Sequence, residues 1–459
     1  MTFKVTKAYN DDTQGFDETV AYRILHCTNV DGNNNKYFVI ELQKNPTTGQ
    51  FRIFTQYGRL AHANTYDLRG PSDDLEAVRK EFDGIVRKKL RGKKIKAEDG
   101  TVREERYVEI DTPSPTVGSA NIRKAKPSGG SRNFRDVFAE DDQFAVPVRT
   151  LLSQLLEENI HQITGLSAVT VSDAGLETPL GPVTVEHLAK ARAMLEALRQ
   201  IGPIDVRDPQ VRRLNTDYFS LVPHRFGSRI TDRDMISSDA TLLQEFDLLD
   251  QMETAVQMSD ASQDNAAAGT RHDYGLRMEL LTDQGACDEI VQRVDSTRRH
   301  TQLNAWKVRR IFTLENKDRS RYRPLPGPEY DLFHGSKNAN VLSILLNGFM
   351  IPPVSAPHVT GRMFSDGVYG ASAVTKSLNY STGFWDGRGN QYDNSFVFIA
   401  RFSMGNVYET YTSMPQGLPR GTSYNSIHAK AGKSLANDEY IVPNVNQVTI
   451  THLIEFGRG

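Results

Sequence analysis

The sequence predicts a multidomain α+β protein, with a small β-rich domain, an all-α domain and a mainly antiparallel α+β domain in that order. The 459 residues exceed the size of one ordinary hydrophobic core. The middle of the chain carries apolar residues at the spacing of amphipathic helices, and both ends contain aromatic and β-branched runs typical of strands. Charged residues make up 24% and hydrophobic residues 38% of the chain, which indicates globular domains and not disorder.

The composition excludes several classes of protein. No apolar run approaches the ~18 residues of a membrane span, and the first residues lack the apolar core of a secretory signal. Cys27 and Cys287 are the only cysteines, so we expect no disulfide framework, no cysteine-based zinc site and a reducing compartment. The net charge of −2 hides a basic run, since residues 85–96 contain seven Lys or Arg and no acid. That run predicts a polyanionic partner for one domain.

The β-rich domain is predicted over residues 1–111. Segments 36–43 and 51–55 have strand composition, and residues 45–49 between them include Pro and Gly. This pattern predicts a β-hairpin with a glycine-containing loop. The triplet Tyr57-Gly58-Arg59 follows the second strand directly.

With a helix expected at 75–82 and a closing strand at 107–111, this domain resembles the WGR domain, which is named for a Trp-Gly-Arg triplet. Tyr57 stands here where the family has tryptophan. The resemblance implies binding of broken DNA ends, with Tyr57 stacking on an end nucleotide and Arg59 supporting the contact. Taken alone, the triplet also fits a glycine turn with a solvated arginine, and the basic run fits a solvated face or a nuclear-import signal.

Residues 112–142 are predicted to be a flexible basic linker, because they are rich in Pro, Gly and Ser and carry five Lys or Arg but no acid between Pro113 and Arg135. The all-α domain is predicted over residues 143–270, and its His224 is expected to be a hydrogen-bonded structural residue. Apolar residues at helical spacing occur at 148–156, 188–198 and 242–256.

The C-terminal domain is predicted over residues 271–459. Many strands and few helices indicate a mixed, mainly antiparallel α+β fold. No Gly-x-Gly-x-x-Gly motif follows a strand, which excludes Rossmann-type binding of a dinucleotide. Strands are expected at 306–315, 395–402, 440–442 and 448–456.

Three segments of this domain, residues 331–336, 367–380 and 438–442, form one ordered pattern. His334 ends a hydrophobic run in the first segment, and Glu439 starts one in the third. The pattern resembles the His-Tyr-Glu signature of the DNA-dependent poly(ADP-ribose) polymerase family, on the diphtheria-toxin-like ADP-ribosyltransferase fold. The segments 179–182 and 215–227 resemble landmarks of the helical regulatory domain of the same family.

The reaction that this resemblance implies breaks the bond between nicotinamide and ribose in NAD, and it builds positive charge on the anomeric carbon. A carboxylate near the ribose stabilises that charge and engages the incoming hydroxyl, which suits Glu439. A histidine that donates a hydrogen bond to a ribose hydroxyl fixes the sugar, which suits His334.

The nicotinamide itself requires a close backbone approach and aromatic faces. The backbone of Gly335 can approach the carboxamide because glycine has no Cβ, and the Ser377 hydroxyl is expected to be the second partner. Tyr380 offers a face for stacking, and Tyr369 is expected to wall the opposite side. The resemblance assigns Ser336 and Asn340 to the adenosine half, and Lys376 to the acceptor side of the ribose.

The expected function is therefore transfer of ADP-ribose from NAD to protein side chains and onto existing ADP-ribose, with release of nicotinamide and stimulation by DNA breaks. NAD is a consumed substrate, and we expect no cofactor and no metal. The expected partners are NAD, DNA with strand breaks and acceptor proteins, with the chain itself as a candidate acceptor and no membrane. The location is nuclear if the source is eukaryotic and cytoplasmic otherwise.

Two alternatives stay open, namely transfer of a single ADP-ribose and a non-catalytic scaffold that binds DNA ends. Taken singly, Tyr369 and Tyr380 also fit core tyrosines, and Glu439 fits a solvated strand end. Two departures from the family pattern concern, in turn, the donor site and chain elongation. Met350 stands near the position of a basic residue beside the adenine, and the stretch between Tyr408 and Glu439 is shorter than in the nuclear DNA-dependent members.

Overall fold

A computed structural model provides the structure of the chain, and packing divides it into two compact units. One unit comprises Met1–Phe134 and Ile160–Gly269, and the other comprises Arg135–Asn159 and Thr270–Gly459. None of the helices in the described part of the chain is both long enough and apolar enough to cross a membrane. The structure describes residues 15–16, 18–29, 34–59, 64–96, 102–110, 134–139, 141–172, 175–178, 181–224, 226, 230–268, 273–299, 303–351, 363–383, 393–433 and 435–459.

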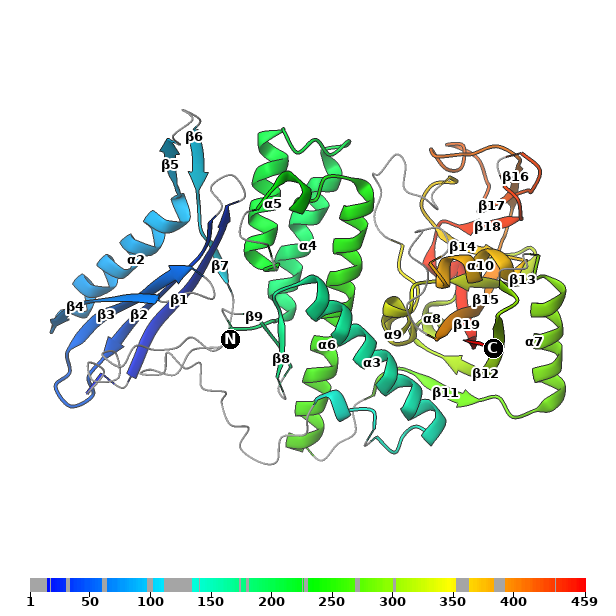
Figure 1. Ribbon diagram of the computed structural model, residues 1–459, viewed down its shortest axis with the longest axis horizontal. Coiled ribbons are helices and arrows are strands. Elements are labelled where there is room, and N and C mark those ends of the chain that lie inside the picture. The colour runs from blue at the N-terminus through cyan, green and yellow to red at the C-terminus, as the bar shows by residue number, and fades with distance from the viewer. Residues whose placement is uncertain are drawn as a thin grey trace. The chain divides into compact units, whose positions relative to one another are not determined.

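The first unit begins with a five-stranded antiparallel sheet in the order β4-β3-β2-β1-β7 (Figure 1). The predicted hairpin is confirmed as β2 and β3, and Asn45 shapes its loop because its Oδ1 accepts hydrogen bonds from Thr47 N at 2.9 Å and Thr48 N at 3.0 Å. The strands are β1 Glu18–Asn29, β2 Asn34–Lys44, β3 Phe51–Arg59, β4 Asn64–Ser72 and β7 Val108–Ile110, and a second hairpin pairs β5 Lys93–Lys96 with β6 Val102–Glu105.

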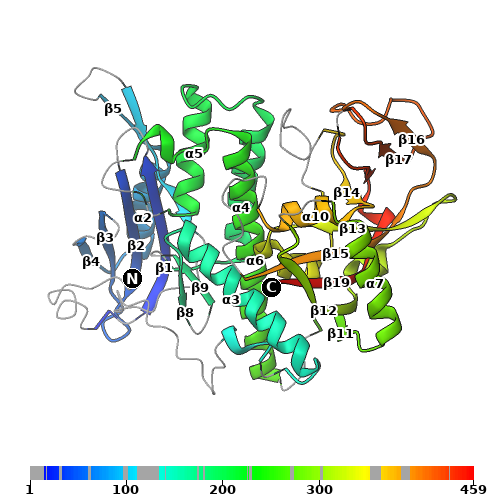
Figure 2. The same cartoon turned by 45° about the vertical axis from the view of Figure 1, so that its right-hand side comes forward.

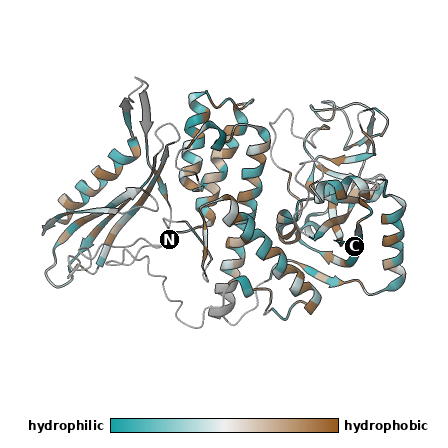
Figure 3. Ribbon diagram, in the orientation of Figure 1, coloured by the Kyte–Doolittle hydropathy of each residue, from teal (hydrophilic) through white to brown (hydrophobic). Residues whose placement is uncertain are grey.

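Helix α2, Leu75–Arg91, covers one face of this sheet. Asp74 caps its N-terminus, accepting a hydrogen bond from Ala77 N at 3.0 Å. Val78, Phe82 and Val86 recur at helical spacing and are buried against the strands. Figure 3 shows apolar and hydrophilic residues alternating along α2, as expected for an amphipathic helix. The helix extends well beyond the predicted 75–82: Val86 adds a further buried turn, and Arg87, Lys88 and Arg91 are exposed to solvent.

The described residues of the helical domain form four long helices, and apolar spacing at 148–156, 188–198 and 242–256 predicted three of them. Thr184 caps α4 by accepting a hydrogen bond from His187 N at 3.2 Å, and Asp208 caps α5 by accepting from Gln210 N at 2.6 Å. The helices are α3 Val146–Leu166, α4 Val185–Gln200, α5 Pro209–Leu221 and α6 Asp239–Ala268, and a small sheet pairs β8 Thr170–Ser172, β9 Gly175–Thr178 and β10 Gly181–Pro182.

The helical domain and the second face of the five-stranded sheet share one hydrophobic core. Ile24, Tyr37 and Val39 of the sheet belong to the same buried cluster as Tyr218 and Phe219 of α5. His26 and Thr28 of β1 also form hydrogen bonds with Ser220 of α5. The N-terminal sheet is therefore packed on both faces, by α2 and by the helical domain.

Residues 111–133 of the predicted linker lie outside the described residues. Residues 134–136 form a short 3-10 helix, and Phe134 and Phe138 are fully buried. The Phe138 ring lies 5.3 Å from the Tyr274 ring, centroid to centroid. Residues 134–139 and 141–142, which the structure describes, thus lie within the predicted linker of 112–142.

The C-terminal domain is a nine-stranded, mainly antiparallel sheet in the order β11-β12-β19-β15-β13-β14-β18-β17-β16, in which β16 and β17 pair in parallel. This confirms the predicted α+β fold, including the strands expected at 306–315, 395–402, 440–442 and 448–456. The elements are β11 Arg277–Leu280, α7 Gln284–Ser296, β12 Trp306–Glu315, α8 Lys317–Arg321, β13 Glu329–Gly335, α9 Asn338–Asn347, β14 Val368–Ala371, α10 Val374–Ser381, β15 Asn394–Ser403, β16 Val407–Thr410, β17 Ser426–Ala429, β18 Glu439–Val442 and β19 Val448–Arg458.

Helix α10 is the element that places side chains over the centre of this sheet. It contacts β13, β14 and β15, and the two views in Figure 1 and Figure 2 show it beside these strands. Val374 and Leu378 of α10 are buried in one cluster with Phe333 of β13 and Val397 of β15. Because these apolar residues fix the helix, its polar residues have defined positions beside the ends of β13 and β18.

Candidate active site

The strand register brings all three signature segments into one row. Phe333 of β13 pairs with Ala371 of β14, and Ala371 pairs with Glu439 of β18. Adjacent strands lie ~4.8 Å apart, so the backbones at Phe333 and Glu439 are roughly 10 Å apart. His334 follows Phe333 directly. The strands that carry the histidine and the glutamate are therefore separated by one strand, β14.

Gly335 ends β13 where α10 approaches most closely. A Cβ at this position would overlap the Ser377 carbonyl oxygen, far inside van der Waals contact. Any other residue would push the helix away from the strand. Ser377 is itself buried, and its carbonyl oxygen accepts a hydrogen bond from Ser381 Oγ at 3.1 Å. The structure thus places Gly335 and Ser377 side by side, as a shared carboxamide site would require.

Glu439 and Lys376 form an ion pair between β18 and α10. The Glu439 side chain is 7% exposed and that of Lys376 is 17% exposed, so the pair is largely withdrawn from solvent. Burial raises the pKa of the Glu439 carboxyl above its ordinary value, although the Lys376 ammonium acts in the opposite direction. A buried carboxylate with one cationic partner retains its proton affinity and can accept a proton from a hydroxyl group.

The His334 ring is half-buried, and its Nδ1 lies 2.8 Å from the Tyr369 carbonyl oxygen. A carbonyl oxygen only accepts hydrogen bonds, so Nδ1 carries the proton. Burial lowers the pKa of His334 below its ordinary value, against the effect of the Tyr369 hydrogen bond. The ring is therefore neutral at pH 7, and its Nε2 accepts a hydrogen bond. The predicted donation from His334 to a ribose hydroxyl would require a proton on Nε2 as well, and the neutral ring does not carry one there.

The two signature tyrosines have different surroundings. Burial, followed by the charge of Glu439, raises the pKa of Tyr380 to about 12, so the phenol stays neutral. The Tyr369 hydroxyl donates a hydrogen bond to the Ser365 carbonyl oxygen at 2.5 Å and accepts one from Phe364 N at 3.2 Å. Tyr369 is thus held at both its backbone and its hydroxyl, whereas Tyr380 lies close enough to Glu439 to respond to its charge.

The remaining predicted residues lie along the chain that leaves β13. Ser336 follows the strand and Asn340 lies in the first turn of α9, and both are half-buried. Met350, at the position where a basic residue was expected, is 51% exposed. Residues 352–362 lie outside the described residues. Helix α10 brings Ser377 against Gly335 and Lys376 against Glu439. His334 directly precedes Gly335, and Asn340 lies on α9, the next element along the chain.

Phe349 contributes to the site, although the sequence analysis did not select it. Its ring lies 4.5 Å from the His334 ring at an interplanar angle of 62°, an edge-to-face arrangement. Phe349 is 3% exposed and also contacts Phe398. A glycine followed by an aromatic residue after a helix was the available signal. Only the fold shows that this ring contacts the histidine.

The predicted DNA-contact residues end strand β3. Tyr57 is 39% exposed and stacks on Phe38 with a centroid distance of 5.9 Å, and the side chain of Arg59 lies outside the described residues. The Lys89 ammonium lies 4.2 Å from the centre of the Phe38 ring and 4.9 Å from that of Tyr107. The exposed cations near the end of α2 are Arg87, Lys88, Arg91, Lys93 and Lys94. Tyr57 and Lys89, at the basic end of α2, therefore contact the same Phe38 ring.

The described residues form no metal centre. Among them, no group of three or more His, Cys, Asp or Glu side chains is arranged to hold a metal ion.

Three family models match successive parts of the chain. A WGR domain matches residues 22–99, a poly(ADP-ribose) polymerase regulatory domain matches residues 146–274, and a poly(ADP-ribose) polymerase catalytic domain matches residues 286–417. The catalytic match includes His334, and Glu439 lies beyond its end. Together the three matches cover most of the chain in the order that the sequence predicted.

Curated relatives align with nearly the whole chain at low identity. Poly [ADP-ribose] polymerase 1 of Danio rerio is 24% identical over 467 residues, which cover 92% of this chain and 43% of that protein. Poly [ADP-ribose] polymerase 2 of Arabidopsis thaliana is 22% identical, covering 94% of this chain and 72% of that protein. Protein mono-ADP-ribosyltransferase PARP3 of Mus musculus is 24% identical, covering 88% and 76%. The chain spans less than half of the length of the first of these relatives.

Proposed function

This chain belongs to the poly(ADP-ribose) polymerase family, with WGR, regulatory and catalytic domains, and we propose that it transfers ADP-ribose from NAD to protein side chains and onto existing ADP-ribose, under stimulation by DNA breaks. The observation that carries the proposal is the approach of α10 to β13 and β18. It brings Ser377 against Gly335, the residue after His334, and pairs Lys376 with Glu439 two strands away in the same sheet.

In the proposed reaction, the bond between the nicotinamide nitrogen and the ribose anomeric carbon breaks, and nicotinamide leaves as a neutral molecule. An acceptor oxygen forms the new bond to the same carbon. Glu439 stabilises the positive charge that develops on the sugar and takes the proton that the acceptor hydroxyl loses. The raised pKa of its buried carboxyl favours that proton transfer. Lys376 orients the carboxylate and faces the acceptor side of the ribose.

NAD is bound through its nicotinamide and its sugars. The backbone of Gly335 and the Ser377 hydroxyl bind the carboxamide, and the absence of a Cβ on Gly335 lets α10 bring Ser377 against this strand. Tyr380 and Tyr369 wall the ring. His334 Nε2 accepts a hydrogen bond from a ribose hydroxyl, as its neutral form requires. The adenosine half is assigned to Ser336 and Asn340.

Stimulation by DNA is proposed for the N-terminal sheet. Tyr57 stacks on an end nucleotide beside Arg59, and the exposed cations at the end of α2 contact phosphates. The sheet is joined to α5 by buried hydrogen bonds: His26 Nδ1 lies 2.6 Å from the Ser220 carbonyl oxygen, and Thr28 N donates to Ser220 Oγ at 2.7 Å. DNA that binds this sheet therefore contacts an element that is packed against the helical domain. This packing supports an energetic coupling between DNA binding and the conformation of the helical domain.

Transfer of a single ADP-ribose is the second candidate. The mouse relative named above is a protein mono-ADP-ribosyltransferase by name, and the stretch between Tyr408 and Glu439 is short. Because that stretch helps to shape the acceptor side, a single transfer is the alternative outcome of the same chemistry. A non-catalytic scaffold is disfavoured by the buried Lys376–Glu439 pair, which DNA binding alone would not require.

The proposed partners are NAD, DNA with strand breaks and acceptor proteins, with the chain itself as a candidate acceptor. NAD is consumed, and the proposed chemistry needs no separate cofactor. A nuclear location is proposed for a eukaryotic source and a cytoplasmic one otherwise, because breaks in chromosomal DNA occur there.

The test incubates the purified chain with labelled NAD, with and without nicked DNA, and resolves the products on a gel. Long products that depend on DNA support the proposal, and a single discrete addition supports the second candidate. Absence of any labelled protein, with intact DNA binding, would support the scaffold. Arg59→Ala and Tyr57→Ala should reduce the stimulation and leave the DNA-free rate unchanged, and the stimulation should fall as salt rises.

A further inference from the structure

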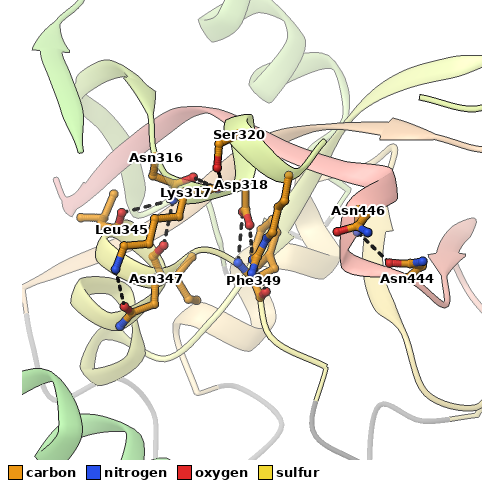
Figure 4. A network of polar contacts seen from close by, with 11 residues as sticks. Asn316, Lys317, Asp318, Ser320, Leu345, Asn347, Phe349, Asn444 and Asn446 are labelled. Atoms are coloured by element: carbon orange, nitrogen blue, oxygen red, sulfur yellow. Dashed lines mark hydrogen bonds and ion pairs between the residues drawn. The ribbon is translucent and has the colours of Figure 1, made fainter. Parts of the chain in front are cut away.

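The contact between Phe349 and His334 depends on how residues 348 and 349 are held after α9 ends. Figure 4 shows that the side chains of α8 and the residue before it meet this segment in one polar network. Asn316 Nδ2 donates to the Ile344 carbonyl oxygen at 3.0 Å and to that of Leu345 at 3.2 Å. Those two carbonyls belong to the last turn of α9, so Asn316 ties the end of α9 to the start of α8.

Asp318 and Arg321, the clamp, hold the backbone of Phe349 at both of its polar groups. Asp318 Oδ2 accepts a hydrogen bond from Phe349 N at 3.0 Å, and Arg321 Nη2 donates to the Phe349 carbonyl oxygen at 2.6 Å. The same Arg321 Nη2 pairs with Asp318 Oδ1. The two side chains therefore form a closed ring of charge-assisted bonds around one residue.

Gly348 lets the clamp close. Its φ of +77° lies in the left-handed region, and a Cβ here would overlap Asp318 Oδ1 and lie 2.7 Å from Arg321 Nη2. Only glycine permits the carboxylate and the guanidinium to reach the following residue in this way.

Burying the charged side chains of the clamp costs desolvation free energy, so the clamp needs a structural or functional role that offsets this cost. The Asp318 side chain has no exposed surface, and a buried carboxylate lowers stability unless its partners replace water. An apolar pair could join α8 to α9 without this penalty. What the charged pair adds is a fixed orientation of the Phe349 backbone, and through it the position of the ring that lies edge-to-face on His334.

We propose that Asp318 and Arg321 are positioning residues for NAD binding: through Gly348 and Phe349 they hold the His334 ring in the orientation that receives the ribose hydroxyl. This inference rests on the proposed function. It concerns the ribose side only, because nicotinamide is assigned to the backbone of Gly335 and to Ser377 and Tyr380 of α10.

The test measures dissociation constants by calorimetry for two probes, NAD and free nicotinamide. The full chain carries Glu439→Gln so that NAD is not consumed. Asp318→Asn, Arg321→Ala and Arg321→Lys are compared. For Asp318→Asn and Arg321→Ala we expect NAD to bind about tenfold more weakly, as for the loss of one charge-assisted hydrogen bond. Nicotinamide should bind as before. Arg321→Lys should recover part of the loss, because a lysine can pair with Asp318 but cannot bridge it to the carbonyl.

Arg319→Ala is the matched control, because Arg319 lies on the same short helix with an exposed side chain, and it should change neither constant. Thermal melting identifies variants that do not fold, and the near-isosteric Asp318→Asn keeps the test valid if Arg321→Ala is one of them. Unchanged NAD affinity in a folded clamp variant would overturn the inference, and so would an equal loss for NAD and nicotinamide, which indicates general loosening. If the parent chain binds neither probe, the proposed function fails instead.

Discussion

His224 of the helical domain and His334 of the catalytic sheet are both half-buried, yet their surroundings differ. His224 Nδ1 lies 2.8 Å from the Val222 carbonyl oxygen and its Nε2 lies 3.2 Å from Glu245 Oε1. His334 has the equivalent backbone contact, with the Tyr369 carbonyl oxygen, but among the described residues no hydrogen bond reaches its Nε2. One histidine has both nitrogens occupied by its own domain, and the other has one nitrogen left for a ligand.

The same difference sets the direction of their pKa shifts. Burial acts to lower the pKa of both rings, but the charge and hydrogen bond of Glu245 outweigh it at His224, so that pKa is raised. At His334 burial prevails, and the pKa is lowered. A histidine beside a buried carboxylate thus stabilises its fold, as the sequence predicted for His224. A histidine without one stays neutral and available to bind substrate.

The largest expected effect is on the rate of ADP-ribose transfer, when the buried carboxylate of the catalytic sheet, Glu439, is changed. Glu439→Gln keeps the shape of the side chain but removes its charge and its capacity to accept a proton. We expect the rate of ADP-ribose transfer to fall ~10²–10⁴-fold with NAD still bound, and chain elongation to be lost. The measurement is product formation from labelled NAD at saturating concentration.

Glu409→Gln is the matched control for that change, because Glu409 is an exposed carboxylate of the same sheet, paired with Lys430. It should leave turnover unchanged. Long products formed by Glu439→Gln at the parental rate would show that the carboxylate is not part of the chemistry.

The next effect concerns stability in the helical domain. Glu245 accepts a hydrogen bond from the Tyr218 hydroxyl at 2.7 Å and contacts His224. Glu245→Ala leaves the buried Tyr218 hydroxyl without this partner, and we expect a loss of about 1–3 kcal/mol in the free energy of unfolding. Chemical denaturation followed by helix content measures it. Glu186→Ala, which removes an exposed pair on α4, should cost little, and equal losses for both variants would contradict the structural role of Glu245.

A smaller effect is expected where an aromatic side chain meets the ligand. Tyr380→Ala removes the stacking face assigned to nicotinamide, and we expect nicotinamide-like inhibitors to bind about 1 kcal/mol more weakly beyond the effect of lost area. Inhibition constants against NAD measure this change. Tyr411→Ala removes an exposed tyrosine of the same domain and should have no effect. Identical constants for the parent and Tyr380→Ala would mean that nicotinamide binds elsewhere.

The smallest effect tests the two histidines directly through pH. The raised pKa of His224 means that its stabilising contribution is present below the ordinary value of 6.5 and is lost as pH rises through the folded value. The lowered pKa of His334 has the opposite sign, since its unfolded state binds more protons. Stability of the catalytic sheet should therefore fall as pH drops below 6.5.

Hydrogen exchange can measure these slopes separately in α5 and β13 between about pH 5.5 and 8, the range in which histidines titrate. His224→Gln should flatten the slope only in α5, and His334→Gln only in β13. Slopes of the same sign in both regions would contradict the assigned protonation states.

The sequence by itself determined the order of the domains, most of the strands and helices, and the signature residues. Those features depend on local patterns: the strand at 306–315 follows from its own composition, and α4 follows from its apolar spacing and Thr184. The triplet at Tyr57 and the ordered set from His334 to Glu439 were visible because each is a short run of specific residues.

Tertiary structure alone decided how those residues act. The position of the proton on the His334 ring depends on the Tyr369 carbonyl oxygen, which lies beside Nδ1. No local sequence pattern encodes that contact. The contact of Phe349 with His334 and its clamp by Asp318 join segments that are far apart in sequence. Hydrogen bonds of this kind, and the burial that shifts a pKa, are properties of neighbours in space, and the chain must fold before those neighbours exist.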